Sequence, residues 1–209
     1  MRWIATGPYC LLTIARDQPV AAGLSLLPPM TPPAKDTHIA LRAPEPPHHS
    51  AEIRVTSTTF QAGGTIPRSM AFSGCGGENV SPQLSWSGFP PGTQSFALTC
   101  FDPDAPTGSG FWHWVLANIP ARVTSLDEGA ASKGLPHGAT QGLTDYGVSH
   151  WGGPCPPAGD RPHRYIFTVY ALAIPAIEGA GPTMNGARLV FSMRGHLLAK
   201  GSIEGHYGR

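Results

Sequence analysis

Charge is scarce in this sequence. Only 13% of its 209 residues are Asp, Glu, Lys or Arg, and the formal net charge is +1. From residue 51 onward, ten basic residues balance ten acidic ones. A neutral chain lacks the electrostatic footprint of a nucleic-acid-binding protein. It also lacks an apolar run of about 18 residues, so neither nucleic acid nor an integral membrane association is expected.

The usual catalytic and cofactor motifs are also missing. The chain has no Gly-x-Ser-x-Gly elbow, no phosphate-binding P-loop and no dinucleotide fingerprint. Its four cysteines, Cys10, Cys75, Cys100 and Cys155, form no Cys-x-x-Cys pair, which argues against a structural zinc site. We expect no cofactor, and we expect buried free thiols, with a Cys75–Cys155 disulfide as the alternative.

Proline is concentrated at the start of the chain. Residues 1–50 hold nine of the 23 prolines and show no helix or strand periodicity, so we expect a disordered extension followed by one domain over 51–209. Arg2 precedes a moderately apolar stretch that Gly7-Pro8 interrupts. The expected location is therefore cytoplasmic, with a periplasmic or secreted protein as the alternative if this start acts as a signal.

The remainder reads as a mainly β domain. Apolar, β-branched and aromatic runs predict strands near residues 53–55, 83–86, 95–101, 111–119 and 164–172, each bounded by Gly, Pro or Asp. One helix is predicted after them, capped by Thr183, running through Lys200 and stopped by Gly201. A final strand is predicted over 202–207.

Two carboxylates follow one of these predicted strands. Asp102 and Asp104 come directly after the run 95–101 and alternate with Pro103, so we expect both carboxylates to face one side. They either line a pocket, accepting hydrogen bonds from an amine or from His113, or cap a turn. Both roles are compatible with one another.

Two histidines complete the candidate pocket. His113 stands between Trp112 and Trp114, and strand alternation places it on the face opposite both, together with Phe111 and Val115. His163 begins another strand, where imidazole and free backbone N–H groups suit an anion. Arg164 should face the other way and form a structural ion pair with Asp160 or Glu78.

These segments carry a family resemblance. The chain resembles the phosphatidylethanolamine-binding protein family, also called the Raf kinase inhibitor-like family, in its bacterial and archaeal branch. The resemblance covers Phe72–Trp86, Asp102–Pro106, Trp112–Trp114, His163–Tyr165, Gly195–Ala199 and Tyr207–Arg209. It implies a β-sandwich-like core with a few flanking helices, one of them near the C-terminus.

The resemblance also implies a site. It points to a non-catalytic pocket for a small phosphorylated or anionic group such as a phospholipid headgroup, with Asp102 attracting an amine and the histidines meeting the phosphate. The expected ligand-binding residues are Asp102, Asp104, His113, Pro156, His163 and Tyr165. Some relatives regulate protein partners, so a kinase or protease partner is a second expectation.

An enzyme is the alternative. Asp102, Asp104, His113 and His163 form a ligand set of two carboxylates and two imidazoles, which could hold a divalent metal ion. Such a site would suit a metal-dependent phosphoester hydrolase. The Pro-stiffened Asp-Pro-Asp loop offers few adjustable ligands, which favours the binding protein.

Overall fold

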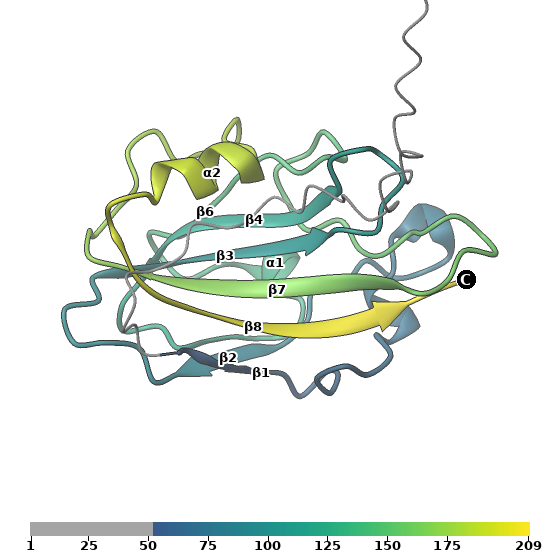
Figure 1. Cartoon of the computed structure of the whole chain (residues 1–209), viewed down its shortest axis with the longest axis horizontal. Helices are drawn as coiled ribbons and strands as arrows, with labels where there is room; N and C mark the ends of the chain where they lie inside the picture. The colour runs from purple at the N-terminus through teal and green to yellow at the C-terminus, as the bar shows by residue number, and fades with distance from the viewer. Residues whose placement is uncertain (1–51) are drawn as a thin grey trace, which may run out of the picture. The chain divides into compact units, whose positions relative to one another are not determined.

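Two antiparallel β-sheets form the part of the chain that the structure, a computed structural model, describes, residues 52–209 (Figure 1). The expected extension 1–50, with Cys10, lies outside these residues. One sheet has the order β1 (Arg54–Thr56), β2 (Leu84–Ser87) and β5 (Ser125–Leu126). The other has the order β6 (Thr140–Gln141), β4 (Phe111–Pro120), β3 (Ser95–Asp102), β7 (His163–Leu172) and β8 (Leu197–Tyr207). The expected mainly β fold is confirmed.

The five-stranded sheet is covered on both faces. One face packs on the small sheet through a core that includes Trp86, Phe96 and Trp114. The other face packs under the helix α2 (Gly186–Ser192) through a second cluster that includes Tyr170 and Leu189 (Figure 1). Because both faces are buried, β3 and β7 read as nearly continuous apolar runs, which is why their bounds were predictable.

The C-terminal helix is shorter than predicted. Asn185, not Thr183, is its N-cap, with the side-chain oxygen accepting a hydrogen bond from the Arg188 N–H at 2.9 Å. Gly195 adopts the left-handed conformation with φ 83° and turns the chain into β8. The apolar residues from Leu197 onward therefore belong to a strand, and the sequence pattern had merged two elements into one.

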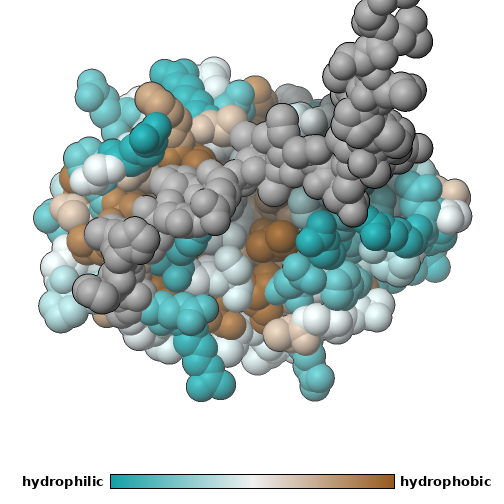
Figure 2. All heavy atoms as spheres, in the orientation of Figure 1, coloured by the Kyte–Doolittle hydropathy of each residue, from teal (hydrophilic) through white to brown (hydrophobic). Residues whose placement is uncertain are grey.

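The short helices sit in the connections. Two 3₁₀ turns, η1 (Arg68–Met70) and η2 (Ser73–Cys75), follow β1, and α1 (Ala130–Lys133) follows β5. None of the helices in the described part is long and apolar enough to cross a membrane. On the face shown in Figure 2, hydrophobic residues lie in several places, from the left edge to the centre, with hydrophilic residues between them.

Candidate functional site

The candidate site lies where three strands of the large sheet meet. Strand β3 ends at Asp102, opposite Phe111 at the start of β4, and the start of β7 runs alongside through the pair Phe101 and Ile166. Antiparallel pairing therefore brings the end of one strand beside the beginnings of two others. Groups that are about 60 residues apart in sequence, such as Asp102 and His163, come into direct contact for this reason.

A pocket of about 240 Å³ opens at this edge of the sheet. It is smaller than the ~300–1,000 Å³ typical of sites for drug-sized ligands, so it suits a small group. The lining brings together five of the six predicted residues and adds several from the neighbouring loops: Asp102, Ala105, Pro106, Thr107, Phe111, His113, Tyr146, Cys155, Pro156, Pro157, His163 and Tyr165. Tyr146, which enters from the loop after β6, belongs to no motif that the sequence analysis singled out.

Asp104 is the predicted residue that does not line the pocket. Its Oδ2 accepts hydrogen bonds from the Arg164 N–H and Nε–H at 3.0 and 2.8 Å, and its Oδ1 accepts one from Arg164 Nη2 at 2.9 Å. These hydrogen bonds lower the pKa of Asp104 from 3.8 to about 2. Arg164 does form the expected ion pair, but its partner is Asp104 instead of Asp160 or Glu78.

The two aspartates diverge because the chain turns at the end of β3. Oδ1 of Asp102 accepts a hydrogen bond from the Asp104 N–H at 2.8 Å, the arrangement of an Asx turn. The extended backbone that would align both carboxylates therefore stops at Asp102. The other oxygen, Oδ2, accepts a hydrogen bond from His163 Nδ1 at 2.8 Å, so the ring that Asp102 holds is His163, not His113.

His113 reaches the pocket through a β-bulge. Cys100 pairs with Trp114 and Phe101 with Trp112, so His113 is the extra residue of β4. His113 and Trp114 both contact Trp151 on the small-sheet side, while Trp112 and Val115 pack on the helix side. Strict alternation had placed Val115 beside His113 and Trp114 opposite, and the bulge reverses both assignments.

Burial and one hydrogen bond define the state of His113. The ring is buried, and burial lowers its pKa from 6.5 to about 4. Nδ1 lies 2.7 Å from the Gly152 carbonyl oxygen, which can only accept, so Nδ1 carries the hydrogen. Nε2 of the neutral ring is then an acceptor, and no residue within 52–209 donates a hydrogen bond to it.

Tyr165 also lines the pocket. The residue is fully buried, and its hydroxyl makes no hydrogen bond of normal geometry within the described residues, although it lies near enough to the Asp102 carboxylate for that group to affect its pKa. Burial, with the nearby Asp102 carboxylate, raises the pKa of Tyr165, so the hydroxyl keeps its proton. Because an unsatisfied buried hydroxyl costs about 1–3 kcal/mol, a ligand atom that reaches it gains that amount.

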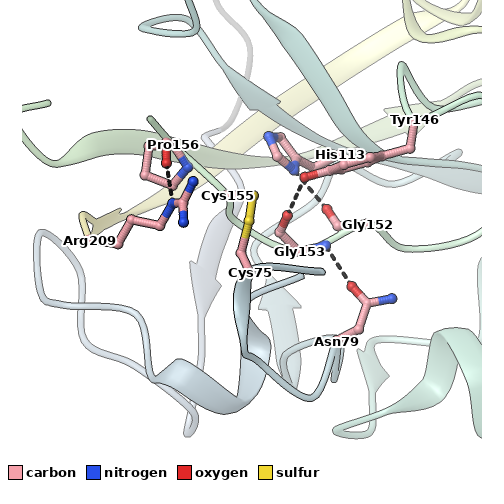
Figure 3. Close-up of a disulfide and its surroundings, with 9 residues drawn as sticks. All are labelled: Cys75, Asn79, His113, Tyr146, Gly152, Gly153, Cys155, Pro156 and Arg209. Carbon is pink, nitrogen blue, oxygen red and sulfur yellow. Dashed lines mark hydrogen bonds between the residues drawn. A yellow bond between two sulfur atoms is a disulfide. The ribbon is translucent and has the colours of Figure 1, made fainter. Parts of the chain in front are cut away.

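A disulfide closes the rim. Cys75 and Cys155 form a disulfide, with their Cα atoms 5.8 Å apart (Figure 3). The expectation of free thiols is therefore wrong at these two positions, and the disulfide alternative is correct. Cys100 is a buried free thiol, as expected. The neighbouring backbone is also held, since the Asn79 side chain accepts a hydrogen bond from the Gly153 N–H at 2.7 Å. The segment before Pro156 is therefore tied to η2 by the disulfide and to Asn79 by a hydrogen bond.

The four residues that could have held a metal ion do not form one ligand set. Among residues 52–209, no group of three or more His, Cys, Asp and Glu side chains is arranged to hold a metal ion. Asp104 points to Arg164, and Asp102 pairs with His163. The fold and the site together define a mainly β protein of two antiparallel sheets, with a small pocket at its strand ends.

Comparison with known proteins identifies the family. The family model described as phosphatidylethanolamine-binding protein matches residues 56–208. The chain belongs to this family, in its bacterial and archaeal branch. UPF0098 protein YbcL of Escherichia coli (strain K12) is 45% identical over 163 residues, which cover 76% of this chain and 88% of that protein. A UPF0098 protein of Methanothermobacter thermautotrophicus is 42% identical over 159 residues, covering 75% and 99%.

The solved structures agree on the fold. The crystal structure of Escherichia coli YbcL, described as a new member of the mammalian PEBP family, superposes with a TM-score of 0.73 at 45% identity. The match covers 76% of this chain and 99% of that one. A putative PEBP homologue from Chlamydia trachomatis matches with a TM-score of 0.66 at 32% identity, covering 77% and 99%.

Proposed function

We propose that this chain is a non-catalytic binding protein whose pocket takes a small phosphate-type anion, either free or as the headgroup of a phospholipid. The observation that carries the proposal is the unpartnered hydroxyl of Tyr165, a buried residue of a small pocket that His113 and His163 also line. The family's name, which refers to a phospholipid with a phosphate headgroup, points in the same direction.

The walls suit a headgroup better than a polymer. Phe111, Tyr146, Pro156 and Pro157 give the pocket a largely apolar lining, to which the buried Asp102, His113 and His163 add a few polar groups. This division, with apolar walls and a few polar groups that fix orientation, is typical of small-ligand sites. In this proposal Asp102 acts on the ligand through His163, because its two carboxylate oxygens already accept hydrogen bonds within the protein.

Calorimetry on the full chain tests the proposal with O-phosphorylethanolamine as the probe. We expect saturable binding that His113→Ala and Asp102→Asn each weaken at least tenfold, because one removes a pocket group and the other frees the His163 ring. His196→Ala is the matched control, since that exposed histidine lies outside the pocket. Unchanged affinity in both pocket variants would refute the proposal.

We further propose that the protein works in an oxidising compartment, such as the periplasm or the exterior of the cell. The Cys75–Cys155 disulfide supports this location, because disulfides are rare in the reducing cytosol. This choice replaces the cytoplasmic expectation with its alternative. Counting free thiols in the denatured protein, isolated without reductant from its native source, tests it: thiols at both cysteines would contradict the proposal.

A further inference from the structure

The pocket has no cation with which to balance an anion. Among residues 52–209, its lining contains neither Lys nor Arg, and the one carboxylate present, Asp102, is buried. Its Oδ2 lies 2.8 Å from His163 Nδ1, so the negative charge that a carboxylate brings is already beside that ring. A phosphate that enters the pocket must therefore find its compensating positive charge elsewhere.

The nitrogen of His113 that is left for a ligand is an acceptor. Its Nδ1–H is committed to the Gly152 carbonyl oxygen, and the neutral ring offers only the lone pair of Nε2. A fully ionised phosphate oxygen also offers only lone pairs, and two acceptors repel. A hydrogen must lie between them, brought either by the ring or by the ligand.

We propose that the pocket binds its anion together with one proton, which lies between a ligand oxygen and His113 Nε2, and that it therefore selects phosphomonoesters over phosphodiesters. This inference rests on the proposed function and, because the phosphate of a phosphatidylethanolamine headgroup is a diester, it favours a free phosphomonoester over that headgroup as the ligand of the same site. A monoester carries a second ionisable P–OH group, whereas a diester has none and must wait for the ring to be protonated.

The cost of supplying the proton differs between the two routes. With a pKa of about 4, the buried ring is protonated in about one molecule in a thousand at pH 7. A phosphomonoester, with its second pKa near 6, keeps its proton in about one molecule in ten at that pH. If the two complexes are otherwise equally tight, a monoester is favoured about 100-fold at pH 7.

The neighbouring groups do not take over this role. Asp102 already accepts hydrogen bonds at both oxygens, and Cys155 is bonded to Cys75. The titratable groups that face or surround His113 from the packed elements are Asp102 and Cys100 from β3, His163 and Tyr165 from β7, and Tyr146 from the loop after β6. Burial raises the pKa values of Cys100, Tyr146 and Tyr165, so these three stay neutral.

Two matched probes test the inference on the full chain: O-phosphorylethanolamine, a monoester, and sn-glycero-3-phosphoethanolamine, a diester with the same amine. Calorimetry from pH 5 to pH 8 should show a monoester affinity that is constant up to about pH 6 and then falls tenfold per pH unit. The diester affinity should fall tenfold per pH unit over the whole range from pH 5 to pH 8, because the pKa of His113, about 4, lies below that range.

Buffers of different ionisation enthalpy give a second readout, the number of protons taken up. At pH 8 we expect about one proton per monoester bound, and none at pH 5, where the ligand brings its own. The variant His113→Gln places an amide N–H at the position of Nε2, so its binding should lose the pH dependence. His196→Gln is the control and should keep it.

The outcomes separate the two proposals. Binding that is flat from pH 5 to pH 8, or a diester that binds as tightly as the monoester at pH 7, would overturn proton-linked selection and leave the proposed function intact. Failure of both probes to bind at any pH would overturn both. Flat wild-type pH profiles overturn the inference even if the Gln variant does not fold.

Discussion

Replacing Asp104 by Asn tests whether the Asp104–Arg164 ion pair stabilises the fold without contributing to ligand binding. Asp104 accepts three hydrogen bonds from Arg164, and a fourth contact reaches Arg161 Nη2 at 3.3 Å. An Asn side chain keeps one carbonyl oxygen but directs an N–H₂ group at the guanidinium and removes the charge. We expect Asp104→Asn to destabilise the fold while the affinity for O-phosphorylethanolamine changes less than threefold, because Asp104 lies outside the pocket lining.

The magnitude follows from the pKa of Asp104, which the Arg164 hydrogen bonds lower from 3.8 to about 2. A shift of that size corresponds to about 2.5 kcal/mol as an upper limit. The Asp104 side chain is 7% exposed but that of Arg164 is 45% exposed, so solvent screening reduces the expected loss to about 1–1.5 kcal/mol at pH 7.

The stabilisation that Asp104 provides should decrease as the pH is lowered. Because the pKa of Asp104 is lower in the folded protein than in the unfolded chain, its stabilisation is complete above about pH 4 and disappears as pH falls through about 2. Urea unfolding of the wild type and of Asp104→Asn at pH 7, 5, 3 and 2 should give a difference in the free energy of unfolding that is the same at pH 7 and 5 and becomes smaller below pH 4. Asp127→Asn, at an exposed site, is the control. A difference that persists unchanged at pH 2, or a tenfold loss of affinity, would refute this role.

Three further predictions follow from the described residues. Replacing both Cys75 and Cys155 by Ser should lower the free energy of unfolding by up to about 4 kcal/mol, because the disulfide spans 80 residues; equal urea midpoints would contradict this. Gly201→Ala should cost about 2 kcal/mol or more in urea unfolding, since the added methyl collides with a backbone oxygen of the segment before β1, whereas Gly181→Ala, in open space, should cost little. Tyr165→Phe removes an unsatisfied hydroxyl, so thermal unfolding should show equal or higher stability while calorimetry shows about tenfold weaker binding of O-phosphorylethanolamine; a large loss of stability would show that the hydroxyl is already satisfied.

The sequence predicts those parts of the fold whose conformation depends on residues close to one another along the chain. The bounds of β3 and β7 were predictable because buried apolar runs end at polar residues, Asp102 and His163. The length of α2 was not, because Leu197 and Leu198 fit a helical face as well as a strand, and only pairing with β7 decides between them.

The site was predictable in its membership but not in its contacts. Asp102, His113 and His163 do share one pocket, as their motifs indicated. The partner of each polar group depends on non-local geometry. A turn directs Asp104 to Arg164, and a register shift in β4 places His113 on the same side of the strand as Trp114. Pairing of cysteines 80 residues apart likewise depends on the folded chain, and composition alone favoured free thiols.

The register shift in β4 has a consequence for any change in the length of that strand. His113 has no counterpart on β3, so the residues before and after it follow opposite inside–outside parities. Deleting His113 itself would make the hydrogen-bonded ladder regular, and Trp112 would stay paired with Phe101 while Trp114 stayed paired with Cys100. A more perfect sheet would then carry a pocket that has lost one of its imidazoles.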